Sequence, residues 1–586
     1  MTPKKVVTPE PVRPHRAVFE AAIEKLRRSL SEDSYTTFPD VMVSNAIRLV
    51  KKLGIEDIEE WIAESIGKGR PQTKIAVSVS ALFVAMGLAA IDAREMLIER
   101  FTKVLYWQIS DEMRSELGLG ERVEPGGPGW DAAYQRVRRT FHAVASVMDP
   151  SPNPKNRILT KKEFKSQVQS LTPEFEAEAY RRLDLISNRI VHLSFLLLPR
   201  YVRRRWKGSG AIDATPVPLF SRGTSKRGKY VSVDPDGGWY VKKEMKIPPS
   251  WSMEATLFVC GPDDYRLESS FPRLCLGMAL HRPGEAPDKN AMRVLNSMAE
   301  RGLPVNYLAA DRNYFPKCFP ENLQIPARAL GWKLVFDYND ADLGKPQVDA
   351  HGIVVLEGSM YCSAILKAEL LCRATIDFRD CLISKDVYTE RLRAREAYEV
   401  LVHDYQSGRE TLRLTCRAAG GIRATVQCEN KPNLHARPSL PIINNPPKRL
   451  PTICSAETVR VEEAFGLRWI QDLRYGTDEW HAIYSVLRQC IEGYNGIAKD
   501  GAWENLRDKS RRRVRGIAAQ TLFVAVLIFA ANLRKIERFL SAAKPSAADR
   551  SLVVVNKQRP ARKRATEPKF RTRRAVLAGT GRRALD

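Results

Sequence analysis

The sequence contains ten cysteines but no C-x-x-C pair, the spacing found in redox motifs and in many zinc sites. The cysteines are too scattered to indicate a disulfide framework, so we expect a reducing cytoplasm as the compartment. Six of them fall in or beside one region at long, irregular intervals. A zinc site is the alternative there, but the spacing favours buried free thiols. These six are Cys362, Cys372, Cys381, Cys416, Cys428 and Cys454.

Other absences narrow the class of protein further. The first 20 residues carry charge and prolines but lack the apolar segment of a secretory signal. The "GSG" at 208–210 precedes an expected strand, which is the wrong order for a nucleotide-binding loop, and we find no other ATP-binding motif. The longest apolar run, 516–533, is interrupted by Gln520 and Asn532 and flanked by basic residues. It predicts a buried helix rather than a membrane span.

Acidic residues are fewer than basic residues. Asp and Glu number 68 against 94 Lys and Arg, which gives a net charge of +26. A surplus of this size attracts polyanions and strengthens binding through counterion release. We therefore expect nucleic acid as the partner, with a membrane surface or the ribosome as the alternative.

The chain of 586 residues is too long for a single ordinary core, and its 44% hydrophobic and 28% charged residues are typical of globular domains. Helical periodicity dominates the first 200 residues, β-type segments then alternate with a helix, and further short strand-like segments follow. We expect an α+β multidomain protein. Its segments are a helical, DNA-binding domain (1–205), the first part of an α/β core (206–340), a β-rich insertion (341–460), the second part of the core (461–540) and a disordered basic tail (541–586).

Two aspartates in the α/β region are candidate catalytic groups. Asp311 ends the strand-like "VNYLAAD", and Asp213 lies inside the strand-like "AIDAT". A charge within a strand is costly unless it is paired or binds a metal. Asp311 has the alternative of a simple turn residue. If both strands belong to one sheet, the two carboxylates lie side by side.

The helix expected over 478–503 supplies further candidates. Tyr484, Arg488, Glu492 and Lys499 fall on one helical stripe. A separate apolar stripe is expected to be buried, and it consists of Trp480, Ile483, Leu487, Ile491 and Tyr494. Arg488 and Glu492 have the alternative of a plain i, i+4 helix pair. Asn495-Gly496 is a possible helix end before Lys499.

In this order, the motifs resemble those of the DDE transposases of bacterial insertion sequences, in the branch with a Tyr-Arg-Glu-Lys signature. The family signature Y-x2-R-x3-E-x6-K is matched at Arg488, Glu492 and Lys499, whereas Tyr484 lies one position further upstream. "DRNYF" at 311–315 resembles the family's Asp-Arg-Gly-Tyr/Phe segment, with asparagine in place of glycine. The resemblance covers roughly residues 205–540.

The resemblance implies an RNase H-like catalytic core and a transposase. Such an enzyme binds the terminal repeats of an element, cleaves DNA at the ends and joins the 3′-hydroxyls to target DNA. Two Mg²⁺ (or Mn²⁺) ions would be held by the catalytic residues Asp213, Asp311 and Glu492. Tyr484, Arg488 and Lys499 would bind DNA.

The resemblance also implies partners and a location. Double-stranded DNA would be bound at the element ends and at the target, by a homodimer in the synaptic complex. The protein would act in the bacterial cytoplasm at the nucleoid, with no membrane involved. The alternatives are an inactive or domesticated DNA-binding relative, and a metal-dependent nuclease that does not join strands.

Overall fold

The computed structural model describes most of the chain. The described ranges are 37–66, 77–92, 95–153, 157–241, 248–263, 271–315, 318–406, 411–433, 437–462, 465–466 and 468–542. Residues 1–36 of the expected helical domain and the basic tail from residue 543 onward therefore lie outside the described residues.

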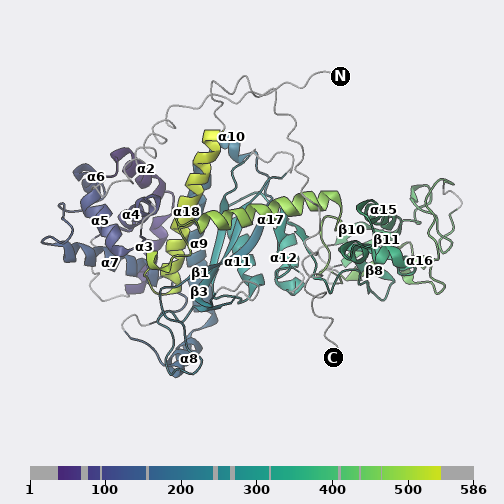
Figure 1. Cartoon of the computed structure of the whole chain (residues 1–586), viewed down its shortest axis with the longest axis horizontal. Coiled ribbons are helices and arrows are strands. Elements are labelled where there is room, and N and C mark those ends of the chain that lie inside the picture. The colour runs from purple at the N-terminus through teal and green to yellow at the C-terminus, as the bar shows by residue number, and fades with distance from the viewer. Residues whose placement is uncertain are drawn as a thin grey trace, which may run out of the picture.

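Helices make up the described part of the first 205 residues, as the periodicity predicted (Figure 1). Their N-caps follow the expected chemistry, because Ser78, Ser110, Thr160 and Thr172 each accept a hydrogen bond from a backbone N–H of the first turn. The elements are α2 (Asp40–Val50), α3 (Ile55–Ile66), α4 (Val79–Ile91), α5 (Ile98–Lys103), the π-helix η1 (Val104–Gln108), α6 (Asp111–Glu116), α7 (Trp130–Ser146), α8 (Lys161–Ser170), α9 (Pro173–Leu197) and α10 (Arg200–Arg203).

A six-stranded mixed sheet follows. Its strand order is β2-β3-β1-β5-β6, with β4 also paired to β3. The β1–β3 and β3–β4 pairs are antiparallel, whereas β1–β5 and β5–β6 are parallel. The protein is therefore a mixed α/β structure. The strands are β1 (Gly210–Pro218), β2 (Gly238–Tyr240), β3 (Ser250–Cys260), β4 (Cys275–His281), β5 (Tyr307–Ala310) and β6 (Lys333–Phe336).

Helices cover both faces of this sheet. A Cβ added to Gly261, just after β3, would lie 2.4 Å from Leu487 on α17 (Asp478–Ala498). A Cβ added to Gly277 on β4 would lie 2.7 Å from Val294 on α11 (Pro287–Glu300). Gly277 pairs with Phe258, which is an odd number of residues from Gly261, so the two glycines point to opposite faces. α17 thus lies on one face and α11 on the other.

The helix α18 (Ile517–Ala542) joins the helical module to the sheet. It packs against α9, α4 and β4, and one continuous buried cluster runs through all of them. The apolar run 516–533 is therefore a buried helix, as predicted. Among the described residues, α18 is the one helix long and apolar enough to cross a membrane, and 94% of its most apolar window is buried inside the protein.

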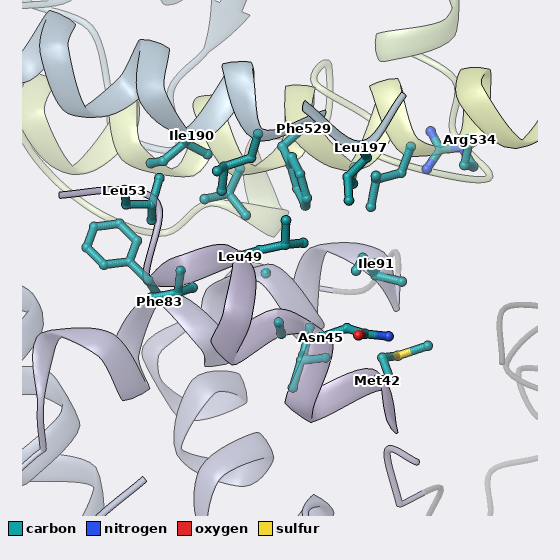
Figure 2. A pocket seen from close by; sticks show the side chains of 18 of the residues that line it. Met42, Asn45, Leu49, Leu53, Phe83, Ile91, Ile190, Leu197, Phe529 and Arg534 are labelled. Atoms are coloured by element: carbon teal, nitrogen blue, oxygen red, sulfur yellow. The ribbon is translucent and has the colours of Figure 1, made fainter. Parts of the chain in front are cut away.

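A cavity of about 100 Å³ interrupts this core where α2 and α4 face α9 and α18 (Figure 2). Leu49 and Phe83 line it from one side, and Ile190 and Phe529 line it from the other. Its lining is almost entirely apolar. None of the six candidate site residues lies in its wall.

The segment 341–460 contains two three-stranded sheets, β7-β8-β9 and β10-β11-β12, the last strand reaching Glu462. It also contains helices that the expectation of a β-rich insertion did not include. "IRATVQCEN" (422–430), expected to be strand-like, instead forms loop and a short 3-10 turn, η6 (Gly421–Arg423). The strands are β7 (Gln347–Val348), β8 (Ile353–Leu356), β9 (Ser359–Cys362), β10 (Val400–Gln406), β11 (Thr411–Cys416) and β12 (Thr458–Glu462). The helices are α13 (Glu369–Cys372), α14 (Ala374–Arg379), α15 (Lys385–Arg395) and α16 (Thr452–Ser455).

Candidate functional site

Asp213 and Asp311 lie on neighbouring strands. The parallel β1–β5 ladder pairs Ile212 with Ala310, and the next residue on each chain is an aspartate. The two aspartates therefore stand at the same level of the sheet, on neighbouring chain segments whose backbones are about 5 Å apart. Asp311 also shapes a turn, because Tyr314 N donates to its carbonyl oxygen at 2.9 Å and Arg312 N donates to its Oδ1 at 2.7 Å. Asp311 can thus be both a turn residue and a member of the candidate site.

α17 runs across the face of the sheet on which Asp213 lies (Figure 1). Asp213 pairs with Leu257, which alternates in step with Gly261 and therefore points toward the same helix. The predicted apolar stripe is confirmed, since its five members from Trp480 to Tyr494 are all buried. Asn495-Gly496 does not end the helix, which continues to Ala498 with Lys499 as its C-cap.

Arg488 lies between two of the candidate carboxylates. Its Nη1 is 3.9 Å from Asp213 Oδ2, and its Nη2 is 3.6 Å from Glu492 Oε1. Both separations are too long for a hydrogen bond. The Nη1 atom is buried and has no hydrogen-bond partner among the residues that the structure describes. The structure thus brings Asp213, Arg488 and Glu492 together and leaves one donor of Arg488 unused.

Tyr484 and Lys499 complete the stripe on either side of Arg488. The Tyr484 ring stacks on Trp480 with a centroid distance of 4.7 Å. Burial raises the pKa of Tyr484, as do the nearby charges of Asp337 and Asp311. Tyr484 is therefore a neutral phenol close to the aspartates. The positive charge of Lys499 also reaches the site, where it lowers the pKa of Asp213.

Burial dominates the electrostatics of Asp213. It raises the pKa of this carboxyl to about 6, and the negative charge of Asp311 adds to the increase. Arg488 opposes the shift but does not cancel it. A further cation placed beside this carboxyl would stabilise its ionised form. The neighbouring positive charges thus balance the negative charge of Asp213 only in part.

Asp337 stands in register with Asp213 and Asp311, and the sequence analysis did not identify it. The β5–β6 ladder pairs Ala310 with Phe336, so Asp337 follows β6 as Asp311 follows β5. Asp337 accepts a hydrogen bond from Tyr475 Oη at 2.7 Å. Burial raises its pKa, and Asp311 is among the charges that contribute. The signal was present, because "KLVFD", like "VNYLAAD", is an apolar strand that ends in an aspartate.

The basic run "RRRVR" at 511–515 is only partly a surface feature. Arg512 is 1% exposed, and its Nη2 donates to the carbonyl oxygens of Leu506 at 2.9 Å and Pro218 at 3.3 Å. Its neighbour Arg513 is exposed, with its guanidinium over the Phe220 ring at 5.3 Å. Arg512 therefore ties the chain after α17 to the end of β1, and Arg513 remains available to a polyanion.

The donors at the site suit a hard divalent cation, because three carboxylates offer oxygen ligands. The raised pKa of Asp213 fits the same role. Within the described residues, however, no group of three His, Cys, Asp or Glu side chains is arranged to hold a metal ion. Arg488 lies between Asp213 and Glu492. Asp213 and Asp311 stand in register, and the Arg488 guanidinium would have to move for Glu492 to share a cation with Asp213.

In comparisons with known proteins, no family model and no curated protein matches this chain.

Proposed function

We propose that the protein is a DNA transposase with an RNase H-like core, which cleaves DNA at element ends and joins the 3′-hydroxyls to target DNA. One observation carries the proposal: Asp213 and Asp311 stand in register on adjacent strands, under a helix that brings Arg488 and Glu492 to them. The sheet is compatible with it, because β5 and β6 run parallel to β1 on one side, while β3 pairs antiparallel with β1, β2 and β4.

The residues divide the chemistry among them. Asp213, Asp311 and Glu492 would hold Mg²⁺ or Mn²⁺, which supplies activation of the attacking oxygen and stabilisation of the leaving oxygen. Arg488 binds a phosphate oxygen through the Nη1 donor, for which the described residues provide no partner. Such a contact draws the guanidinium away from Asp213 and Glu492, which opens the space between the carboxylates. Tyr484 and Lys499 hold the backbone on either side.

The surplus of positive charge supports double-stranded DNA as the partner. Handling two element ends at once requires at least a homodimer in the synaptic complex. The proposed place of action is the bacterial cytoplasm, at the nucleoid.

A relative that binds DNA without cutting it is the second candidate. The observation in its favour is Arg488, whose position between Asp213 and Glu492 provides a counter-charge without a metal. The two candidates differ in whether the carboxylates are needed for cleavage.

The test is cleavage of labelled duplexes that carry the inverted repeats flanking the gene, in Mg²⁺ and in EDTA. We expect nicking at the repeat ends in Mg²⁺ only. Asp311→Asn should abolish it while a gel shift on the same duplex is retained. Glu479→Gln, an exposed residue in the first turn of α17, is the matched control and should cleave normally. A wild-type protein that shifts the duplex but never cuts it would support the DNA-binding relative instead.

A further inference from the structure

Four cysteines that are far apart in the sequence line a single small cavity in the insertion, at the far end of the molecule from the helical module (Figure 1). Cys362 ends β9, Cys416 ends β11, Cys454 lies in α16, and Cys428 lies in the loop that follows η6. The cavity measures about 20 Å³, which is room for one water molecule or one ion.

The thiols are close enough to influence one another. Burial raises the pKa of Cys362 to about 12, and Cys416, Cys454 and Cys428 each add to the increase. Burial likewise raises the pKa of Cys454, with Cys416 and Cys428 as further contributors. Buried thiols usually pack as small apolar groups, but four that converge on one cavity also form a set of potential thiolate ligands.

Backbone donors point at the sulfur atoms. Ala418 N donates to Cys416 Sγ at 3.4 Å, two residues along the chain. The same i+2 relationship recurs where Ala364 N donates to Cys362 and Asn430 N donates to Cys428. Donors aimed at sulfur stabilise thiolates rather than thiols.

The backbone around two of these cysteines forms tight turns that fix this arrangement. Ala419 N donates to the Cys416 carbonyl oxygen at 2.9 Å, and Lys431 N donates to that of Cys428 at 3.0 Å. Lys431 Nζ in turn donates to Ala456 O at 2.6 Å, which ties the Cys428 turn to the α16 segment. Its positive charge lowers the pKa of Cys454.

The insertion also lacks a large core of its own. Its buried residues form two small clusters, one around Val354, Leu356 and Tyr361 and the other around Ile353, Leu414 and Val459. The four cysteines lie where these clusters meet, and Cys362 and Cys416 border both. A metal bound at this junction would link the two clusters.

We propose that Cys362, Cys416, Cys428 and Cys454 bind one structural Zn²⁺ as a tetrathiolate site. Four sulfur ligands are the donor set of closed structural zinc sites, with Zn–S bonds of about 2.3 Å. As placed, the four side chains surround the cavity without forming a closed group, since no metal-ready set of three exists in the described part of the chain. Binding therefore draws the thiols inward and releases their protons to solvent.

All six cysteines of this region are free in the structure, as expected, and the proposed site would add zinc to four of them. Sequence spacing concealed it, because each ligand comes from a different turn or strand end. The remaining two cysteines of the region lie outside the cavity: Cys372 donates its thiol to Ile365 O at 3.2 Å, and Cys381 is exposed. Substitutions at Cys372 and Cys381 therefore serve as controls for zinc binding.

The test is metal analysis of the full-length protein, independent of any DNA activity. We expect about one zinc per chain by mass spectrometry of the metal, and with Co²⁺ in its place the intense visible bands of a tetrahedral thiolate complex. Cys428→Ser and Cys454→Ser should lose most of the zinc, and Cys381→Ser should retain it. Cys454→His, which keeps a zinc-competent ligand, should restore metal binding and guards against a variant that merely misfolds.

Three outcomes would overturn the proposal. The first is a wild-type protein that takes up no zinc after reduction and reconstitution. The second is an intact mass lowered by the loss of hydrogens, which would show that these cysteines form disulfides. The third is iron with inorganic sulfide, since the same four thiolates suit an iron–sulfur cluster.

Discussion

Arg488 Nη1 faces Asp213 Oδ2 across 3.9 Å and, within the described part of the chain, forms no hydrogen bond with it or with any other group. A buried guanidinium donor without a partner is costly, typically by about 1–3 kcal/mol. The arrangement leaves the carboxylate only partly compensated and the arginine unsatisfied. A phosphate bound by Arg488 would satisfy the free donor, and a cation bound by Asp213 would balance the carboxylate charge.

Glu492 distinguishes an enzyme from a binding protein. Its side chain is 56% exposed, so its contact with Arg488 contributes at most a few tenths of a kcal/mol to stability. Glu492→Gln should therefore change the free energy of unfolding by less than about 0.5 kcal/mol. It should abolish end cleavage while leaving the gel shift intact. Cleavage at a rate near that of the wild type would remove Glu492 from the site.

Asp337 is expected to contribute to the same chemistry. Asp337→Asn keeps an acceptor for Tyr475 Oη but removes the third charge from the row. Cleavage should fall at least about tenfold, or roughly 1.4 kcal/mol of barrier. Tyr475→Phe is the control: it deletes the hydrogen bond, should cost about 1 kcal/mol of stability, and should leave the cleavage rate nearly unchanged. Equal rate losses in the two variants would make Asp337 a structural residue.

Local patterns predicted much of the fold. Alternation and apolar runs indicated β1, β3 and β5, and the 3.6-residue period indicated α11 and both faces of α17, because each of these elements buries one side against the core. The patterns did not single out β4 and β6, short strands buried by their neighbours rather than marked by their own periodicity. They also missed the short helices of the insertion.

Features that depend on long-range register were not readable from the sequence. Asp337 joins Asp213 and Asp311 only because β6 pairs with β5 in one particular register. The four cysteines meet only after turns separated by up to 92 residues have closed on one cavity, from Cys362 to Cys454. A basic run likewise gives no sign that Arg512 points inward while Arg513 points outward. Tertiary packing decides these cases.

Stability should depend on pH through Asp236, which lies in the loop between β1 and β2. Burial raises its pKa to about 7, and the charges of Asp149 and Asp234 contribute, while the Ser151 hydroxyl and Ile517 N donate to it. Because the folded carboxyl holds its proton more tightly than the unfolded one at 3.8, stability falls as pH rises between these values.

Asp236→Asn removes this dependence. The variant should gain stability relative to the wild type from about pH 4 upward and level off above pH 7, by up to roughly 4 kcal/mol. Urea unfolding at a series of pH values provides the measurement. Asp340 is exposed, so for the control variant Asp340→Asn the free energy of unfolding should depend on pH as it does for the wild type. Parallel curves for Asp236→Asn as well would contradict the assignment.

The cavity beneath α4 offers a stabilising substitution. A Cβ added to Gly87 would meet no atom within 4 Å, and this residue lies in the helix interior and in the cavity wall. Gly87→Ala should raise the free energy of unfolding by about 1 kcal/mol through helix propensity. Gly277→Ala is the contrasting variant, because its Cβ would lie 2.7 Å from Val294 Cγ1 and should destabilise the sheet. A destabilised Gly87→Ala would show that the cavity is closed in solution.

Arg512 and Arg513 are adjacent arginines with opposite expected roles. Arg513→Gln removes an exposed charge and should weaken DNA binding about equally for all sequences, with the slope of log affinity against log salt reduced by about 1. Arg512→Gln should leave that slope unchanged but cost about 1–3 kcal/mol of stability, because the carbonyls of Pro218 and Leu506 lose a buried donor. Salt-dependent gel shifts and urea unfolding on both variants separate the two effects. A reduced slope for Arg512→Gln would place this side chain at the DNA surface, against the burial seen in the structure.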